Sequence, residues 1–335
     1  MSDSQGTSSP PPPPPAEKKY ALSMFPRKIP VHPEYADKVI HLQEKLGRKV
    51  LVLVDEYNPP PFRVFDQNAY AYRQLRRYKD QLPKEPIAVL LDSWGGSAMT
   101  AFKLATLIRR RCGSYCAVVP EYALSAATLF ALGADSIYLG DDAVLGPLDA
   151  QLFDHDVEED WVSALDTVQA VEQLDGLAIE VALKMLKYLQ DRTNKKRNLL
   201  LRHALRFAVE ITHPLFNKID AIRYSRQSRM LKEAQDYAER LLQPKFEKEQ
   251  AEAIARDLVR RYATHDFVID REESKSIGML QEEGREGRTV GLHVKRDLSA
   301  DLESLLDWFA ININRTWGLG FVEETAPSTE TANGQ

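Results

Sequence analysis

Two consecutive strand–turn–helix segments constrain the fold of this chain more than any other feature. In the first, the apolar run 87–91 is followed by Gly95 and Gly96 and then by an amphipathic stretch. In the second, the apolar run 116–119 is followed by a short turn, and Ser125 opens an apolar stretch. Short β-branched apolar runs predict buried strands, and the periodic stretches after them predict helices. Because strands alternate with helices here, the sequence favours a parallel α/β core.

The two turns carry residue types that acyl-bond hydrolysis requires. Gly95 and Gly96 can adopt positive φ and let a substrate approach the main chain. A serine at the first turn of a helix, as at Ser125, lies near unpaired N–H groups and the positive end of the helix dipole. Two neighbouring turns of this kind can place a serine hydroxyl beside backbone N–H donors, which is the pairing of nucleophile and oxyanion donors that acyl-bond hydrolysis needs. Taken alone, each feature is typical of an ordinary turn or N-cap.

A third motif makes the combination specific. Gly-Gly is followed in order by Ser-Ala-Ala-Thr at 125–128 and Leu-Gly-Pro-Leu-Asp-Ala-Gln at 145–151. This order resembles the serine dehydrogenase proteinase family, which belongs with signal peptide peptidases and the proteolytic subunit of Clp in the Clp/crotonase superfamily. The resemblance covers about residues 50–280 and is strongest at 87–151. Segments 262–269 and 273–280 resemble the closing segment of the family.

The resemblance implies a fold, an activity and a site. The fold is α/β, a Clp/crotonase-like spiral of strand–strand–helix units with an extended C-terminal helical region. The activity is that of a serine peptidase with Ser125 as nucleophile and an oxyanion hole near Gly95, Gly96 and Ala126. Two departures from the family pattern bear on the site: Trp94 stands where the family has proline, and Ala127 where it has glycine. We expect Trp94 to reshape the cleft and Ala127 to crowd the oxyanion hole, and neither removes the nucleophile.

A serine hydroxyl needs a base within hydrogen-bond distance. We rank His265 first, because it lies beside the segment that supplies the third triad member in Clp-type subunits, with Asp149 as the carboxylate that orients it. Lys184 and Lys187 are alternatives, although their helix is expected to leave them in solvent. His155, between two aspartates, is the third choice.

Composition excludes several other classes. The chain has 335 residues, 44% of them hydrophobic, and a net charge of −5, which suits a large core but gives no general attraction to nucleic acid. No apolar run reaches the ~20 residues that a membrane span needs. There is no signal-peptide pattern, and two cysteines in a chain of this size predict reduced thiols and a cytoplasmic protein. We expect no metal and no cofactor.

The expected organisation has four parts. Residues 1–20 form a disordered Pro-rich tail, and 21–160 the Clp/crotonase-like core. Residues 161–320 form a helical region that packs on the core and completes the active site, with helices expected at 162–191, 199–211, 221–242, 247–262 and 302–313. Residues 321–335 form a second disordered tail. The resemblance also implies a homo-oligomer.

Three functions compete. The first is a serine peptidase that acts on peptides or unfolded protein through an acyl-enzyme, independently of ATP in this chain. The second is a crotonase-like acyl-CoA enzyme, which needs no serine at position 125. The third is a catalytically inactive oligomeric scaffold of the same fold. Association with a membrane through a partner protein is compatible with each of them.

Overall fold

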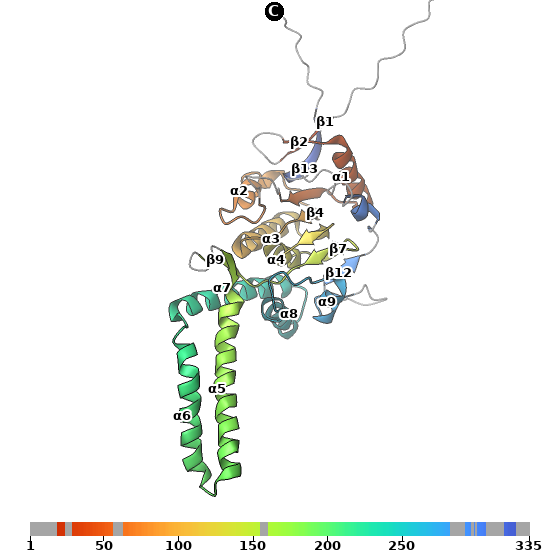
Figure 1. Ribbon diagram of the computed structural model, residues 1–335. Helices are drawn as coiled ribbons and strands as arrows, with labels where there is room; N and C mark the ends of the chain where they lie inside the picture. The colour runs from red at the N-terminus through yellow and green to blue at the C-terminus, as the bar shows by residue number, and fades with distance from the viewer. Residues whose placement is uncertain are drawn as a thin grey trace, which may run out of the picture.

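The structure is a computed structural model. It describes residues 19–325 except 24–28, 56–62, 155–159, 282–291, 296–297, 299 and 306–317. The protein is a mixed α/β fold with a C-terminal helical region, as the sequence predicts (Figure 1). Its main sheet has nine strands. In spatial order these are β11 (Leu280–Gln281), β12 (Leu292–Lys295), β7 (Ser136–Leu139), β5 (Tyr115–Val119), β4 (Ile87–Asp92), β3 (Val50–Val54), β13 (Gly318–Thr325), β1 (Lys19–Leu22) and β2 (Ile29–Val31).

The centre of the sheet is parallel, which confirms the expected α/β core. Strands β3, β4, β5, β7, β12 and β11 all run in one direction. At the other edge, β13 pairs antiparallel with β3 and with β1, and β1 pairs antiparallel with β2. Strand β13 continues to Thr325, past the boundary expected at residue 321, because Phe321 and Val322 are apolar side chains that the sheet buries.

Helices cover both faces of the sheet. All five residues of β3 are buried, and they alternate between two cores. Leu51 and Leu53 face the core that contains helices α2, α3 and α4, whereas Val50, Val52 and Val54 face the core under α1. Alternate side chains of a strand point to opposite faces. A central parallel strand therefore has to be apolar throughout, which is the pattern that made it predictable.

The described helices of the N-terminal half include the two that the sequence predicts, one after the glycine turn and one at Ser125. In chain order, the described helices of this half are α1 (Pro33–Leu46), α2 (Tyr70–Arg77), the 3-10 turn η1 (Lys79–Gln81), α3 (Ala98–Cys112) and α4 (Ala126–Leu132). Helix α1 begins with a proline in its first turn and ends at Gly47, which adopts φ 60°. Both residues are typical of these two positions.

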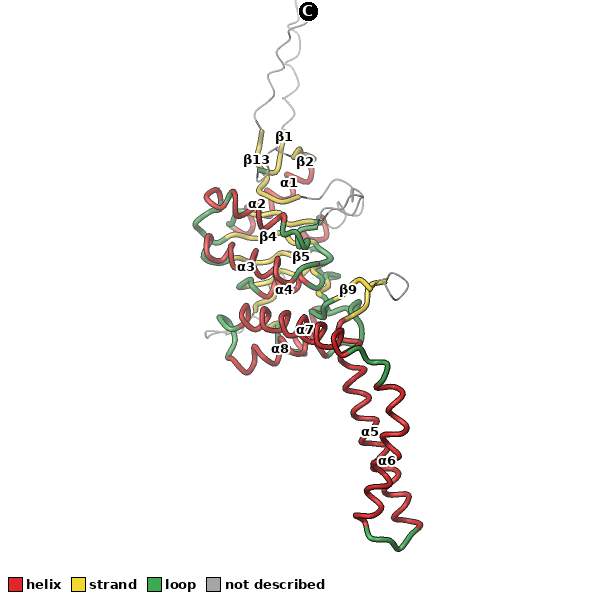
Figure 2. The backbone as a smooth tube through the Cα atoms, turned by 90° about the vertical axis from the view of Figure 1, so that its left-hand side faces the viewer, coloured by secondary structure: helices red, strands yellow, loops and turns green. Residues whose placement is uncertain are grey.

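The C-terminal half contains the helical region, whose helices lie between residues 164 and 276 and are joined by loops. Its helices are α5 (Ala164–Arg192), α6 (Arg197–Phe216), α7 (Ala221–Leu242), α8 (Lys248–Arg260) and α9 (Arg271–Ser276). Helices α7 and α8 pack on the core, but α5 and α6 leave it as an antiparallel pair (Figures 1 and 2). The boundary expected at residue 160, between the α/β core and the helical region, does not separate the sheet from the rest of the chain. Strands β11, β12 and β13 come after this residue and belong to the main sheet. Of the helix expected at 302–313, residues 302–305 are helical and the rest lies outside the described residues.

Among the helices that the structure describes, none combines the length and the apolar character that crossing a membrane would require.

Candidate active site

Short backbone pairings beyond the main sheet hold the two predicted turns together. Strand β6 (Tyr122–Ala123) pairs with β8 (Val144–Leu145). Ser93, just after β4, forms a bridge with Ala123, and Leu145 forms one with Ile269. The glycine turn, the serine turn, the segment of Asp149 and the segment of His265 are thus joined one to the next. Residues that are far apart in sequence meet at the carboxyl ends of the parallel strands, where α/β proteins place their sites.

Gly95 lies directly against the serine turn. Its φ is 97°, and a Cβ atom added there would be 2.4 Å from the carbonyl oxygen of Leu124 and 2.9 Å from Cβ of Ser125. Gly96 has φ 138°, and its Cβ would be 2.3 Å from the carbonyl oxygen of Phe65. Both positions therefore require glycine for backbone conformation and for space.

Ser125 has a conformation that is rare for a residue with a side chain. Its φ is 49° and its ψ is −115°, and it is one of two described non-glycine residues with positive φ. It precedes α4 as the N-cap, but its side chain accepts no capping hydrogen bond. The common structural role of a serine at a helix start is therefore not filled here. Strained backbone of this kind, which costs about 1–3 kcal/mol, clusters at active sites.

Two backbone N–H groups beside Ser125 have no acceptor among the described residues. They belong to Gly96 and to Ala126, the first residue of α4. The N–H of Gly95, in contrast, donates to Oγ of Ser93 at 3.1 Å. The N–H groups of Gly96 and Ala126 are thus available to a bound oxygen atom, whereas the N–H of Gly95 is already used within its own turn.

His265 and Asp149 are in direct contact. Nδ1 of His265 lies 2.7 Å from Oδ1 of Asp149, whose side chain is only 3% exposed. The other oxygen of Asp149 accepts a hydrogen bond from Oγ of Ser163 at 2.6 Å. Ser163 is the N-cap of α5 and also accepts from the N–H of Leu165. The carboxylate is thus fixed from one side by the helix and presents its second oxygen to the imidazole.

The structure gathers the predicted residues around one cavity of about 710 Å³. Its lining includes all six predicted site residues: Gly95, Gly96, Ser125, Ala126, Asp149 and His265. Lys184 and Lys187 are exposed on α5 and do not line the cavity, and Lys184 pairs with Glu180. His155 lies outside the described residues.

The two departures from the family pattern have different outcomes. Ala127 is completely buried in the core and is absent from the cavity lining, so it does not fill the space beside Ser125. Trp94 does line the cavity, with 53% of its surface exposed. Its ring lies edge-on to Tyr122, and the guanidinium of Arg63 lies 5.6 Å from its centre. Trp94 thus forms part of the cavity wall, as expected for a residue that reshapes the cleft.

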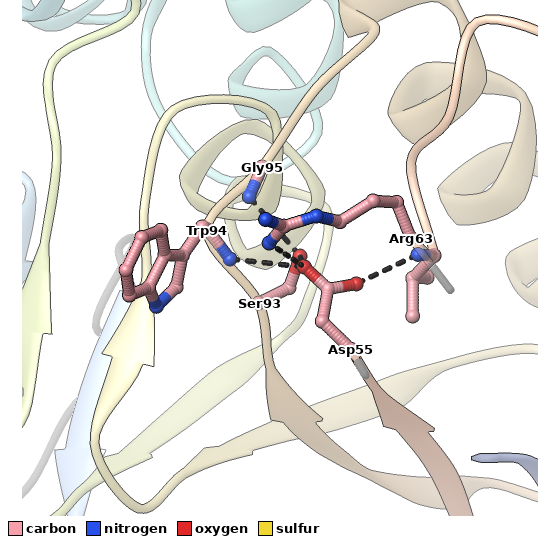
Figure 3. Close-up of polar contacts among 6 residues, drawn as sticks. Asp55, Arg63, Ser93, Trp94 and Gly95 are labelled. Atoms are coloured by element: carbon pink, nitrogen blue, oxygen red, sulfur yellow. Dashed lines mark hydrogen bonds and ion pairs between the residues drawn. The ribbon is translucent and has the colours of Figure 1, made fainter. Parts of the chain in front are cut away.

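A buried carboxylate that the sequence analysis missed fixes the glycine turn (Figure 3). Asp55, fully buried just after β3, accepts hydrogen bonds from Oγ of Ser93 at 2.8 Å and from the N–H of Trp94 at 3.1 Å. It also accepts from the N–H of Val64 at 2.7 Å, and Arg63 lies 3.4 Å away. Burial raises the pKa of the Asp55 carboxyl above its usual value, against the lowering influence of these donors. The connection runs from Asp55 through Ser93 to the N–H of Gly95.

Thr128 has a similar supporting role on the serine side. Its Oγ1 accepts from the N–H of Gly146 at 2.9 Å and lies 2.6 Å from the carbonyl oxygen of Ala123. It thereby connects α4 to the segment that leads to Asp149. The position of Thr128 in the Ser-Ala-Ala-Thr motif was the available signal. For Asp55 the signal was a polar residue immediately after a buried strand.

No group of three or more potential metal-ligating side chains occurs within the part of the chain that the structure describes. The site consists of an alcohol, an imidazole, a carboxylate and backbone N–H groups. This set of groups is suited to nucleophilic acyl transfer.

Comparison with known proteins relates part of this chain to a class of proteins. The family model of ClpP-like SDH-type serine proteinases matches residues 39–195, which include the glycine turn, Ser125 and Asp149. Residues 39–195, a little under half of the chain, therefore match the SDH-type ClpP-like serine proteinase family. This confirms the family that the sequence motifs indicated.

The relatives found by sequence have no stated activity. An uncharacterized protein of Methanocaldococcus jannaschii is 27% identical over 242 residues, which are 72% of this chain and 66% of that protein. A second uncharacterized protein of the same organism is 24% identical over 106 residues, which are 32% of this chain and 36% of that protein. The chain therefore spans less than two thirds of the length of either relative.

Solved structures of proteases show a weaker similarity. A mutant of the 1510-N membrane-bound stomatin-specific protease in complex with a substrate peptide has a TM-score of 0.38 at 16% identity, over 78% of this chain and 79% of that one. A mutant of ClpP1 from Listeria monocytogenes has a TM-score of 0.31 at 13% identity, over 78% of this chain and 99% of that one. The relation to the family therefore depends on the family match.

Proposed function

We propose that this chain is a serine peptidase that hydrolyses peptide bonds through an acyl-enzyme on Ser125. The observation that carries the proposal is the shared cavity, in which Ser125, the His265–Asp149 pair and the free N–H groups of Gly96 and Ala126 meet. The match to a serine proteinase family supports the same reaction.

Each group has a role in the proposed reaction. His265 removes the proton from the Ser125 hydroxyl as the oxygen attacks the peptide carbonyl, and Asp149 holds the imidazole through Nδ1 so that Nε2 is the basic nitrogen. The N–H groups of Gly96 and Ala126 donate to the oxyanion that forms. The imidazolium then returns its proton to the leaving amine, and water hydrolyses the ester by the same steps in reverse.

The cavity suits a peptide or an unfolded protein segment. Phe65, Leu129, Leu148 and Met230 give it apolar walls beside the proposed reacting groups. Such walls can accept apolar side chains, while an extended substrate backbone is bound by polar groups. We place the reaction in the cytoplasm, because Cys112 and Cys116 are buried free thiols.

A fluorophosphonate probe tests the nucleophile, since it reacts covalently with activated serine hydroxyls. We expect the wild type to be labelled and Ser125→Ala not to be, with the adduct located on Ser125 by mass spectrometry. Hydrolysis of fluorescein-labelled casein is expected to be lost in the same variant.

Ser97 provides a matched control, because it lines the same cavity but caps α3 through the N–H of Thr100. Ser97→Ala should therefore keep the label. Absence of label on folded wild-type protein would contradict the proposal and favour the acyl-CoA enzyme or the inactive scaffold, which coenzyme A binding would separate.

A further inference from the structure

Asp149 is a buried carboxylate whose two oxygens have different partners. Its side chain is 3% exposed, so solvent contributes little to stabilising its charge. Within the described part of the chain it has two hydrogen-bond partners: Nδ1 of His265 lies 2.7 Å from Oδ1, and Oγ of Ser163 lies 2.6 Å from Oδ2. Burial of an ionised carboxylate is costly unless donors compensate it. The bond at Oδ2 therefore helps to keep Asp149 ionised beside the imidazole.

A second hydrogen bond fixes the direction in which the Ser163 hydroxyl donates. Ser163 is the N-cap of α5, and its Oγ accepts from the N–H of Leu165 at 3.0 Å. A hydroxyl has one proton to donate, and an ionised carboxylate can only accept. The proton of Ser163 is thus directed to Oδ2 of Asp149, in a short charge-assisted bond. Because hydrogen bonds in series strengthen one another, the N-terminus of α5 acts on Asp149 through this hydroxyl.

The backbone holds Ser163 and Asp149 beside each other. Ser163 ends the second of two short antiparallel strands, and Gln151, which begins the first, lies opposite it. Next to this pair, the N–H of Ala164 donates to the carbonyl oxygen of Ala150 at 2.7 Å. Asp149 lies immediately before these paired residues. The contact between the two side chains is therefore supported by regular backbone pairing and not by a single loop conformation.

We propose that Ser163 is a positioning residue for the His265–Asp149 pair. This inference rests on the proposed function, which makes His265 the base and Asp149 its orienting carboxylate. Ser163 is not among the residues that line the cavity, so it acts through the carboxylate and not on the substrate. Its hydroxyl holds Oδ2, which leaves Oδ1 facing Nδ1 of His265, and it takes up part of the negative charge. Without this donor the pair binds a proton more tightly, whether on the imidazole or on the carboxylate.

Loss of the hydroxyl should therefore change the pH dependence of the reaction. The unprotonated pair is the form that accepts the proton of Ser125, so tighter proton binding moves the acidic limb of the labelling profile to higher pH. A hydrogen bond to a charged group corresponds to a shift of about one pH unit.

Other charged side chains also lie around the pair. Those in the cavity wall, in the first turn of α5 or next to His265 in sequence are Arg63, Asp66, Glu233, Asp166 and Asp266. They are the same in every variant of Ser163. A difference between these variants is therefore due to the residue at position 163.

Three substitutions of Ser163 in the full chain separate positioning from helix capping. Ser163→Ala and Ser163→Gly both remove the donor, but glycine is much the better N-cap of the two. Ser163→Thr keeps the hydroxyl and the cap. Fluorophosphonate labelling of Ser125 should slow about tenfold or more in Ser163→Ala and Ser163→Gly, with the acidic midpoint raised by about one pH unit. Ser163→Thr should restore both the rate and the midpoint.

Asp220→Ala is the matched control for loss of a cap. Asp220 caps α7 through the N–H groups of Ile222 and Arg223 and does not line the cavity. Its replacement should lower the thermal unfolding midpoint, as Ser163→Ala does, without moving the acidic limb of the profile. A shift of that limb in Asp220→Ala equal to the shift in Ser163→Ala would mean that loss of a helix cap, and not of the donor to Asp149, causes the effect.

Histidine NMR makes the test independent of the proposed reaction. The Cε1–H signal of His265, identified by its absence in His265→Ala, is followed as a function of pH in protein with isotope-labelled histidine. Its midpoint should rise in Ser163→Ala and Ser163→Gly but not in Ser163→Thr, whether or not Ser125 reacts. A wild type that takes no label but shows these NMR shifts would contradict the proposed function alone. Midpoints that stay at the wild-type value in Ser163→Ala and Ser163→Gly would overturn the role of Ser163.

Discussion

Nδ1 of His265 lies 2.7 Å from Oδ1 of Asp149, although 116 residues separate the two in sequence. The contact is formed because Leu145 and Ile269 pair through their backbones, with N–H to oxygen distances of 2.9 and 3.0 Å. Asp149 follows Leu145 by four residues and His265 precedes Ile269 by four, so this pairing brings the two side chains together. The imidazole is held by a carboxylate that is itself buried, so its orientation is fixed before any substrate arrives.

Replacement of His265 should remove the base and leave the fold intact. We expect His265→Ala to lower the rate of fluorophosphonate labelling by about 10²–10⁴-fold, the usual contribution of general base catalysis. The thermal unfolding midpoint should change little, because the side chain is partly exposed and packs at the cavity edge. Asp266→Asn, at the exposed neighbouring position, is the control. Unchanged labelling in His265→Ala would assign the base to another group, with Lys184 and Lys187 next to be tested.

Replacement of Asp149 separates orientation from proton transfer. Asp149→Asn keeps the size of the side chain but removes the charge that stabilises the imidazolium, so labelling should slow by less than in His265→Ala. The same change weakens the bond from Ser163, and we expect it to lower the free energy of unfolding by about 1–3 kcal/mol. Labelling kinetics and urea unfolding measure the two effects. Equal labelling rates in Asp149→Asn and wild type would mean that the carboxylate has only a structural role.

Gly95 and Gly176 form a matched pair for alanine substitution. Gly95→Ala should disrupt the serine turn, since the new Cβ would be 2.4 Å from the carbonyl oxygen of Leu124 and the φ of 97° disfavours a side chain. Gly176 lies within α5 with no atom near its Cβ position, so Gly176→Ala should stabilise the chain by up to about 1 kcal/mol. Thermal unfolding and labelling of both variants test this. A Gly95→Ala variant that is labelled at the wild-type rate would disprove the close packing of the two turns.

The network of Asp55 predicts an effect on catalysis from a residue that does not line the cavity. Asp55→Asn replaces one carboxylate oxygen, which accepts hydrogen bonds, by an amide N–H₂ group that cannot accept them from Ser93, Trp94 or Val64. The turn that carries Gly96 should therefore shift, and labelling should slow about tenfold or more. Asp66→Asn is the control, because Asp66 also accepts a backbone N–H beside the cavity, but from Tyr70 of α2. If both variants slow labelling equally, Asp55 has no specific effect on the glycine turn.

Lys245 predicts a dependence of stability on pH. Its ammonium donates to the carbonyl oxygens of Leu132 and Ala134, and burial, followed by the charge of Arg109, lowers its pKa to about 7. Between pH 7 and 10 the unfolded chain therefore keeps a proton that the folded chain has lost. In that window the contribution of Lys245 to stability rises with pH, by at most about 1.4 kcal/mol per pH unit.

Urea unfolding at pH 7 and pH 9 measures this contribution. The difference in free energy of unfolding between the wild type and Lys245→Met should change by about 2 kcal/mol in favour of the wild type as the pH rises. The same substitution at the exposed Lys248 should show no such change. A difference that stays constant with pH would contradict the lowered pKa.

Local sequence pattern predicted most elements of the fold because their burial is periodic. Strands such as β3 and β4 are apolar throughout, and helices such as α7 carry an apolar stripe that faces the core. Gly95, Gly96, Ser125 and Asp149 could be predicted because motif order places them on consecutive turns. His265 ranks first as base only because its segment resembles one in the family. Asp55 could not be assigned in this way, since its role depends on the pairing of β3 with β4, which brings it beside Ser93 across 38 residues.

The packing of the helix pair α5–α6 and the pairing of strand β13 were less predictable for a related reason. Helical periodicity indicates that α5 and α6 have apolar faces, but it does not say which surface each face covers. The end of α5 and the beginning of α6 pack on each other and not on the core, as the contact cluster of Leu186 and Leu200 shows. Strand β13 has eight residues near the end of the chain. Its strand conformation depends on long-range pairing with β3 and β1, which the local sequence does not indicate.

That pairing has a consequence for shortening the protein. Lys19 in β1 lies opposite Thr325 in β13, and β13 separates β1 from β3. A chain truncated before Gly318 would leave the fully apolar β3 as an uncovered sheet edge, with its N–H and C=O groups open to pairing with another molecule. Such a truncation should aggregate even if every residue of the cavity were retained, so expression trials should keep the C-terminus at or beyond Thr325.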